Sequence, residues 1–583
     1  MNDGVHEPLG LYQAFFKDAH ARNVAEFFED LVRRSGVDER ENIKTVAELR
    51  KIEGHVAGEA TTAKYWKAAL WLAAIAFAGC ELYVGTNFDW PWIIGGIIFF
   101  APLLYKIRSV LRDVGGRLKN LEGQRDAKRG EAYRQLQPLN RLYGWDMVAQ
   151  LVQKTIPLIA MDDYFSVGRL SELKQNFGWD DHFNDERSIM FSHTGTLNGN
   201  PFVIARTLDH WMGTKTYHGS LTISWTEQER DADGEWRTVT HHETLHASIN
   251  RPFPEYSERS FVIYGNEAAP DLSFSRAPSH LSGLSDGAIS NWRKGREIKK
   301  LEAKARKIED GKSFTVMANR EFDALFGASD RNHEVQFRLL FTPLAQQEML
   351  KLLKDSQIGY GDDFRFAKNG MITIVQPEHM TASGIDGGPE RFHAYDLVGA
   401  RQFFNQYHNN LFRSIYFGIA PLLVIPLYQQ HRSHSDIYRD VLGASSSFWE
   451  HEAIANYFGE DAFQHPECVT RSILKTDARR EDDGVQTVQV TASGYSGLER
   501  VTYVSVHGGD GFSHEVPVHW VEYTDVQRRS AMIVREKAGA GTGERQAGSD
   551  DDALLSELFR KRGVDVNNAI LRRSVMAALY PGH

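Results

Sequence analysis

The chain has 583 residues, of which 42% are hydrophobic and 25% charged, and these globular values exclude a wholly disordered protein. Its 67 Lys and Arg against 77 Asp and Glu give a formal charge of −10, so we expect no nucleic-acid partner. Two cysteines are too few for a disulfide framework or a four-cysteine zinc site.

The first 64 residues have the pattern of an amphipathic helical hairpin. Apolar residues recur at helical spacing over 9–34, and Asp38 with Glu41 makes a capping-box-like start for a second helix. We expect this hairpin to pack on the rest of the protein. The alternative is a coiled-coil stalk, which would make a homo-oligomer.

Two apolar stretches follow, over 65–84 and 90–107. As helices they would rise about 30 and 27 Å, close to the thickness of a bilayer core. Aromatic residues mark their ends, and Lys and Arg lie on the outer flanks. The sequence therefore predicts a two-helix transmembrane hairpin over 65–107 in the cell inner membrane, with the lipid bilayer as a partner and both termini cytoplasmic. A buried hairpin in a large soluble protein is the alternative.

A third apolar segment, 411–428, contains Pro421 and Pro426, which would interrupt a continuous helix. Its longest uninterrupted part suits a buried or membrane-surface element. The alternative is a third membrane span, which would place the residues after it on the other side of the membrane.

The remaining chain predicts an α+β fold with an antiparallel sheet and helices on the cytoplasmic side. Strands are expected over 189–194, 201–208, 217–226 and 236–250, because polar and apolar residues alternate, and Asp231–Gly234 supplies a hairpin turn. Residues 335–341 are expected to form a further strand. The expected regions are 1–64 (helical hairpin), 65–107 (transmembrane hairpin), 108–187 (connecting helices), 188–310 (antiparallel meander with a charged helix), 311–430 (α+β domain ending in the apolar segment), 431–535 (β-rich region), 536–552 (linker) and 553–583 (C-terminal helix).

The strongest chemical motif is His242-Glu243-Thr244-Leu245-His246, which matches H-E-x-x-H. On a helix, His242 and His246 would share a zinc ion and Glu243 would act as a general base, with Glu255, Glu258 or Glu267 as a third ligand. On a strand the two histidines lie about 13 Å apart, too far for one ion. The flanking sequence is rich in β-formers, so we expect a strand with no metal.

Four weaker motifs are interpreted as ordinary structure. Gly283–Gly287 matches G-x-S-x-G but no strand precedes it, and Gly539–Gly543 lies in the linker. The pair Asp362 and Asp363 has no glutamate at the twelfth position of a calcium loop, and His465 with Cys468 has no second ligand pair nearby.

Several segments resemble an uncharacterised bacterial membrane family, a domain of unknown function often encoded beside LemA-type membrane proteins. The segment Phe341–Asp355 (FTPLAQQEMLKLLKD) carries most of the resemblance, which covers roughly 190–435. Three further segments are similar: Ala269–Arg276, Gly359–Phe366 and Ile425–Arg432. The resemblance implies two N-terminal spans, a cytoplasmic α+β domain and a LemA-type protein as a possible partner, and it assigns no catalytic residue.

These patterns favour a membrane-anchored cytoplasmic binding or scaffold protein of unknown ligand, with an unknown protein partner, over an enzyme. The reason is that we find no coherent catalytic constellation, and we expect no cofactor. The alternative is a membrane-bound zinc metalloprotease that uses the HETLH motif at 242–246.

Overall fold

The structure is a computed structural model of the chain and describes residues 6–86, 90–230, 235–279, 317–383, 385–430, 445–480, 485–536 and 569–580. It consists of two compact units, which we describe separately. The first comprises Met1–His20, Val148–Asp386 and Asn410–His583, and the second comprises Ala21–Met147 and Gly387–Asn409. Some predicted features lie outside the described residues. They are the motifs at 283–287 and 539–543, the charged helix expected before 310, and all but the first residue of the linker expected over 536–552.

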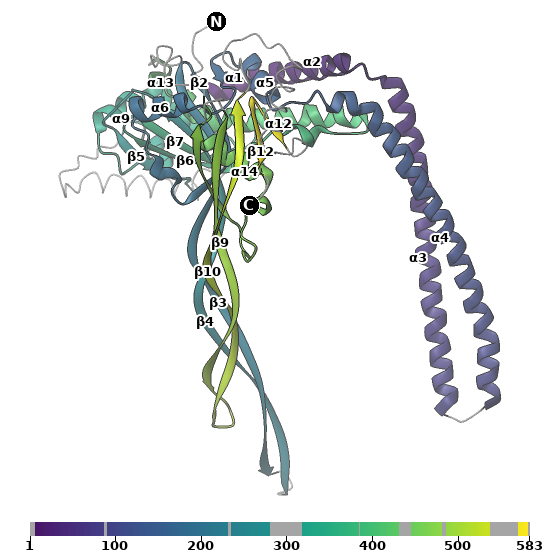
Figure 1. Cartoon of the computed structure of the whole chain (residues 1–583). Coiled ribbons are helices and arrows are strands. Elements are labelled where there is room, and N and C mark those ends of the chain that lie inside the picture. Colours follow the sequence, from purple (N-terminus) through teal and green to yellow (C-terminus); the bar gives the residue numbers. More distant parts are fainter. Residues whose placement is uncertain are drawn as a thin grey trace. The chain divides into compact units, whose positions relative to one another are not determined.

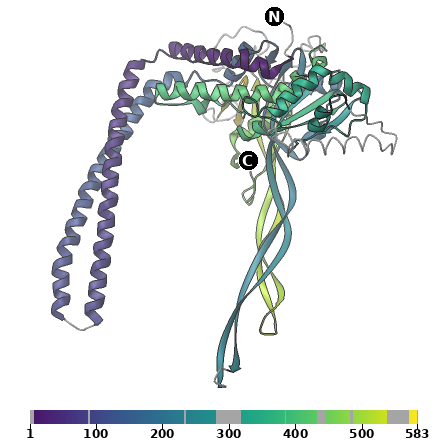
Figure 2. The ribbon, with the colours of Figure 1, turned by 180° about the vertical axis from the view of Figure 1, so that it is seen from behind.

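The second unit is built around two long helices, α3 (Glu39–Thr86) and α4 (Trp90–Asn140), which lie side by side in both ribbon views (Figures 1 and 2). Helix α2 (Lys17–Ser35) precedes them. The expected cap is present, because Asp38 Oδ1 accepts hydrogen bonds from the backbone N–H groups of Arg40 (2.9 Å) and Glu41 (3.1 Å).

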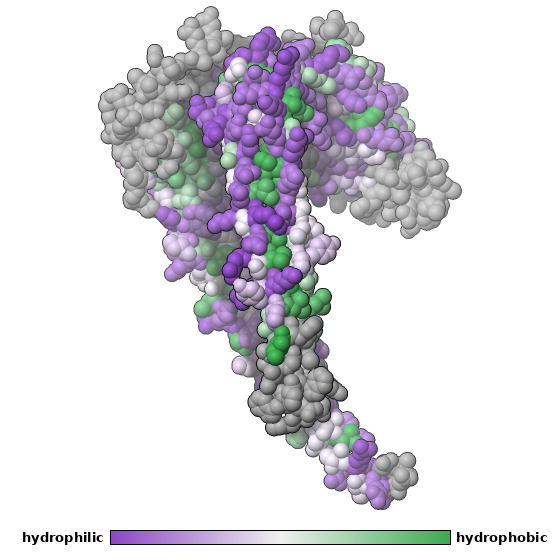
Figure 3. All heavy atoms as spheres, turned by 90° about the vertical axis from the view of Figure 1, so that its right-hand side faces the viewer, coloured by the Kyte–Doolittle hydropathy of each residue, from purple (hydrophilic) through white to green (hydrophobic). Residues whose placement is uncertain are grey.

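The predicted transmembrane hairpin over 65–107, and with it the inner-membrane location, is wrong. Across the residues that the structure describes, none of the helices combines the length and the apolar character needed to cross a membrane. The two windows, of 20 and 18 residues, are parts of α3 and α4, which are 48 and 51 residues long. In the view of Figure 3, hydrophilic and hydrophobic side chains are mixed over the surface that faces the viewer.

The third apolar segment is a buried element of the first unit. Helix α12 (Leu397–Leu423) continues through Pro421, and α13 (Pro426–Gln430) follows after a short break. Tyr416 is 1% exposed, and its hydroxyl donates a 2.7 Å hydrogen bond to the Pro8 carbonyl. The sequence favoured a buried or membrane-surface element for 411–428, and the structure shows the buried one.

A seven-stranded antiparallel sheet forms the centre of the first unit, with the order β1-β2-β3-β4-β7-β6-β5. Its strands are β1 (Ile159–Met161), β2 (Arg187–Leu197), β3 (Asn200–Arg230), β4 (Trp236–Gly265), β5 (Ser273–Arg276), β6 (Phe364–Asn369) and β7 (Ile372–Pro377).

A second sheet of five strands has the order β11-β12-β10-β9-β8. The C-terminal helix expected from 553 is wrong over residues 569–580, which form two short strands. The strands of this sheet are β8 (Ile473–Arg480), β9 (Gln486–His507), β10 (Ser513–Glu536), β11 (Ile570–Arg572) and β12 (Val575–Leu579).

Helices α6 (Val167–Phe177) and α14 (Phe448–Phe458) contribute to the main core against the first sheet. Phe177 and Trp449 are buried there with Val203 and Ile263 of the sheet. The remaining short helices of this unit are α1 (Pro8–Leu11), η1 (Tyr12–Phe16), α5 (Met147–Thr155), η2 (Asp181–Asn184), α8 (Arg320–Phe326), α9 (Glu334–Leu340), α10 (Pro343–Lys354), α11 (Glu378–Ser383) and η5 (Glu460–Ala462), while η3 (Pro389–Phe392) belongs to the second unit.

The strand expected at 335–341 is wrong, because this segment forms α9. His333 caps the helix by accepting a hydrogen bond from the Gln336 N–H at 3.3 Å. Phe337, Leu340 and Phe341 are buried at helical spacing, so tertiary packing outweighs the β preference of the residues around them.

Candidate functional site

Two β-hairpins of the first unit extend well beyond the sheets that they start from. Strands β3 and β4 stay in continuous register from Phe202 opposite Tyr264 to Arg230 opposite Trp236, while β2 stops pairing with β3 at Asp209. Strands β9 and β10 form a second long hairpin beside the first (Figures 1 and 2). We call the projecting parts the arm, namely residues 210–230 with 236–256 and residues 494–507 with 513–526.

One face of the β3–β4 hairpin packs on the β9–β10 hairpin, mainly through apolar side chains. Its side chains include Leu221, Ile223 and Leu245, which meet Val516 and Val518 of β10. The two hairpins lie close together at Gly219, where an added Cβ would lie 2.1 Å from the Pro517 carbonyl oxygen. Because side chains alternate along a strand, this packing explains the apolar half of the sequence pattern at 217–226.

The opposite face of the β3–β4 hairpin is exposed and carries no Lys, Arg, Asp or Glu over fourteen positions. We call it the hydroxyl face, because nine of its residues are Ser or Thr. Neighbouring strands bring hydroxyls together, as in Thr222 and Thr244, whose Oγ1 atoms are 3.1 Å apart. Its residues are Thr216, His218, Ser220, Thr222, Ser224, Thr226 and Gln228 on β3, with Thr238, Thr240, His242, Thr244, His246, Ser248 and Asn250 on β4.

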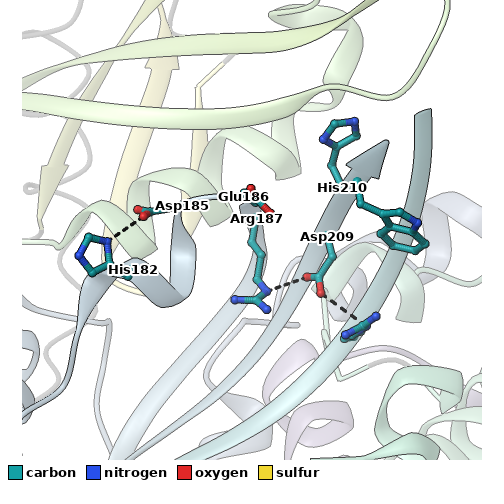
Figure 4. Close-up of a pocket in the computed structure, with 8 residues that line it drawn as sticks. His182, Asp185, Glu186, Arg187, Asp209 and His210 are labelled. Carbon is teal, nitrogen blue, oxygen red and sulfur yellow. Dashed lines mark hydrogen bonds and ion pairs between the residues drawn. The ribbon is translucent and has the colours of Figure 1, made fainter. Parts of the chain in front are cut away.

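A polar pocket of about 460 Å³ lies at the root of the arm (Figure 4). It is formed where η2 leads into β2, where β3 leaves the sheet, and beside one residue of β4. The lining residues are His182, Asp185, Glu186, Arg187, Asp209, His210, Trp211 and Arg259.

The centre of the pocket is a carboxylate between two guanidinium groups. Asp209 is 6% exposed; its Oδ1 lies 3.2 Å from Arg187 Nε, and its Oδ2 lies 3.5 Å from Arg259 Nε. Oδ1 also accepts a 2.7 Å hydrogen bond from Thr207 Oγ1. Arg187 lies over the Phe183 ring, 4.4 Å from its centroid, so its position is set by packing as well as by charge. Two cations against one buried anion leave this end of the pocket with excess positive charge.

The outer rim of the pocket is acidic, with Asp185 and Glu186 both exposed. Asp185 Oδ2 is 2.8 Å from His182 Nδ1, and this hydrogen bond raises the pKa of His182 above its usual value. His210 lies near Tyr256 and Tyr495, and burial lowers its pKa. In Figure 4, Arg187 points toward Asp209, whereas His210 points away from it.

The HETLH segment lies in strand β4, not in a helix. His242 and His246 are exposed on the hydroxyl face, about 13 Å apart by the rise of a strand. Glu243 projects from the other face, where its Oε2 accepts a 2.6 Å hydrogen bond from the Gly509 N–H. The structure therefore separates the three residues that a zinc protease would need together.

The suggested third ligands are also apart from the two histidines. Glu255 and Glu258 lie near the base of β4, and Glu258 forms ion pairs with Arg206 and with Arg471 (2.8 Å). Glu267 lies beyond the end of the strand. In the part of the chain that the structure describes, no three His, Cys, Asp or Glu residues are grouped so as to hold a metal ion.

The two remaining motifs have structural partners. Asp362 accepts a 2.7 Å hydrogen bond from the Ser279 N–H and pairs with Arg276, and Asp363 bonds His379. Cys468 Sγ lies 3.4 Å from the Thr470 carbonyl oxygen. These contacts fix loops and bring together no ligand set.

The pocket was not predicted from the sequence, although two signals mark it. Asp209 directly follows Leu208 at the end of a mostly apolar stretch of β3, and Trp211 is a large aromatic residue two positions later. The register that places Asp209 opposite Ser257, and hence near Arg259, follows only from the fold.

Comparison with known proteins adds no further constraint, since no family model, no curated protein and no solved structure matches the chain.

Proposed function

We propose that this is a binding or scaffold protein that engages its partner through the hydroxyl face of the arm. The observation that supports the proposal is the two-faced β3–β4 hairpin, whose apolar face is covered by β9–β10 and whose other face is exposed. A long strand pair of this kind gives a continuous surface of about 40 Å between Thr216 and Gln228.

The chemistry of the hydroxyl face indicates what kind of partner it suits. Exposed strand surfaces usually include charged residues, and this chain is 25% charged, yet these fourteen positions hold none of the four charged types. Hydroxyl, amide and imidazole groups donate and accept hydrogen bonds. Without formal charge, they exert no long-range electrostatic attraction on a charged ligand. The matching partner is an uncharged polymer with many hydroxyl groups, such as a neutral polysaccharide.

Affinity electrophoresis in native gels tests the proposal, with dextran, xylan or β-glucan in the gel and alginate as an acidic comparison. We expect at least one neutral polysaccharide to retard the protein, with little effect of added salt because no charges take part. Two arginines at Thr222→Arg and Thr244→Arg should abolish the retardation, since they place charge and bulk at the centre of the face.

The matched control carries Ser505→Arg and Thr524→Arg, two exposed positions on the other hairpin of the arm. It should be retarded as strongly as the unmodified protein. Equal mobility of the unmodified protein in all neutral gels, or equal loss in both arginine variants, would overturn the proposal.

A further inference from the structure

We propose that the pocket at the root of the arm binds a small zwitterion, such as a free amino acid or a dipeptide. The proposal concerns a different surface from the hydroxyl face and does not depend on it. It rests on the opposite charge at the two ends of the pocket.

The inner end of the pocket suits a carboxylate. Asp209 lies between Arg187 and Arg259 and is nearest to the Nε atom of each, so one buried carboxylate is shared by two guanidinium groups. Arg259 is 42% exposed at its side chain, and among the described residues it forms no other ion pair. The outer guanidinium N–H groups of Arg259 can therefore donate hydrogen bonds to a ligand carboxylate in forked geometry.

The outer end suits an ammonium group. The Glu186 carboxylate is exposed and has no side-chain hydrogen bond or ion pair to any residue that the structure describes, whereas Asp185 is held by His182. A simple anion bound at Arg259 would be repelled by these two acids. A simple cation bound at Glu186 would be repelled by the arginines. A molecule that carries both charges satisfies both ends at once.

The pocket is large enough for such a ligand and offers an aromatic side chain for it to pack against. Its volume of about 460 Å³ exceeds that of an amino acid, and Trp211 presents an exposed ring beside it. Arg187, Asp209 and Arg259 lie on β2, β3 and β4 of the central sheet, and Glu186 directly precedes β2, so the cationic end in particular is set before a ligand arrives.

Isothermal titration calorimetry of the full chain at low ionic strength tests the inference. Glycylglycine is the zwitterionic probe, and acetate and methylammonium are the two half-ligands. We expect glycylglycine to bind saturably with one site per chain, and each half-ligand to bind at least about tenfold more weakly.

Three variants show whether the binding uses this pocket. Glu186→Gln and Arg259→Gln should each weaken glycylglycine binding about tenfold, because each removes one of the two charges. Arg365→Gln, at an exposed position of β6, should leave binding unchanged. Glu186 is exposed and forms no ion pair with the described residues, so its variant remains informative even if Arg259→Gln fails to fold.

Three results would overturn the inference: no saturable heat with glycylglycine, acetate binding as tightly as glycylglycine, or unchanged affinity in Glu186→Gln.

Discussion

The Glu243 carboxylate accepts a hydrogen bond from the Gly509 backbone N–H at 2.6 Å, which ties the β3–β4 hairpin to the turn of the β9–β10 hairpin. The glutamate of the HETLH motif thus has a structural role in the arm. Its position on the covered face, opposite the two histidines, follows from the alternation of a strand.

This arrangement predicts that the motif does not bind zinc. After incubation with zinc and buffer exchange, elemental analysis should show the same metal content in the unmodified protein and in His246→Ala, because His242 and His246 lie about 13 Å apart. A content of one zinc per chain that is lost in His246→Ala would show that the segment is not a strand in solution.

The close approach of the two hairpins predicts a steric effect at Gly219. In Gly219→Ala the new Cβ would lie 2.1 Å from the Pro517 carbonyl oxygen, so the hairpins must separate, at a cost of about 1–3 kcal/mol. Amide hydrogen exchange in β3 and β10 should become faster. Gly116→Ala in α4 is the matched control, because a Cβ there meets nothing within 4 Å and the helix should be slightly stabilised. Equal exchange in both variants would contradict the packing of the arm.

Burial of His451 predicts loss of stability in acid. Burial lowers the pKa of His451 to about 4, while in the unfolded chain it is about 6.5. Below pH 6.5 the unfolded chain therefore binds a proton that the folded protein does not. The free energy of unfolding is therefore unaffected by this group above pH 6.5. It falls by about 3 kcal/mol as the pH decreases to 4.

Urea unfolding followed between pH 7 and pH 4.5 measures this effect. His451→Gln should show a weaker pH dependence than the unmodified protein, even if its stability at pH 7 is lower through loss of the 2.8 Å contact with Ser446 Oγ. The exposed His507→Gln should keep the full dependence. A steeper slope in His451→Gln than in the unmodified protein would contradict a neutral buried imidazole.

The buried carboxylate of Glu450 forms ion pairs with the C-terminal strands, so we expect its removal to loosen them. Glu450 Oε1 is 2.7 Å from Arg572 Nη1, and its Oε2 is 3.1 Å from Arg573 Nη2. Glu450→Gln removes the buried carboxylate that both arginines contact, which costs about 3–5 kcal/mol. Limited proteolysis should then cut within 569–580, whereas Glu499→Gln, at an exposed site on β9, should resist cleavage like the unmodified protein.

The sequence correctly predicted elements in which the residue periodicity and the flanking turn or capping residues indicate the same structure. The alternation over 217–226 and 236–250, with a turn at Asp231–Gly234, led to a long hairpin, and the structure extends its strands to 31 and 30 residues. Helix α10 (Pro343–Lys354) begins directly after Thr342, whose hydroxyl caps its first turn by accepting a hydrogen bond from the Ala345 N–H. In both cases local signals and tertiary packing favour the same structure.

Other predictions failed where a local window was judged without its surroundings. The apolar windows at 65–84 and 90–107 met the length for a membrane span, but they belong to helices more than twice as long. The pocket could not be predicted, since Arg187, Asp209 and Arg259 come together only through strand register. The periodicity of a strand predicts which face of the sheet a residue occupies. It does not predict which residue of the neighbouring strand lies opposite.

The strand order of the second sheet also bears on protein synthesis. Strand β12 pairs with β10, and the cations that neutralise Glu450 are Arg572 and Arg573. Until the ribosome has released residues 570–579, β10 lacks this neighbour and Glu450 lacks both counter-ions. The second sheet therefore completes its folding only after more than 120 further residues have followed Glu450, and a nascent chain stalled before that point would expose an unpaired sheet edge to other chains.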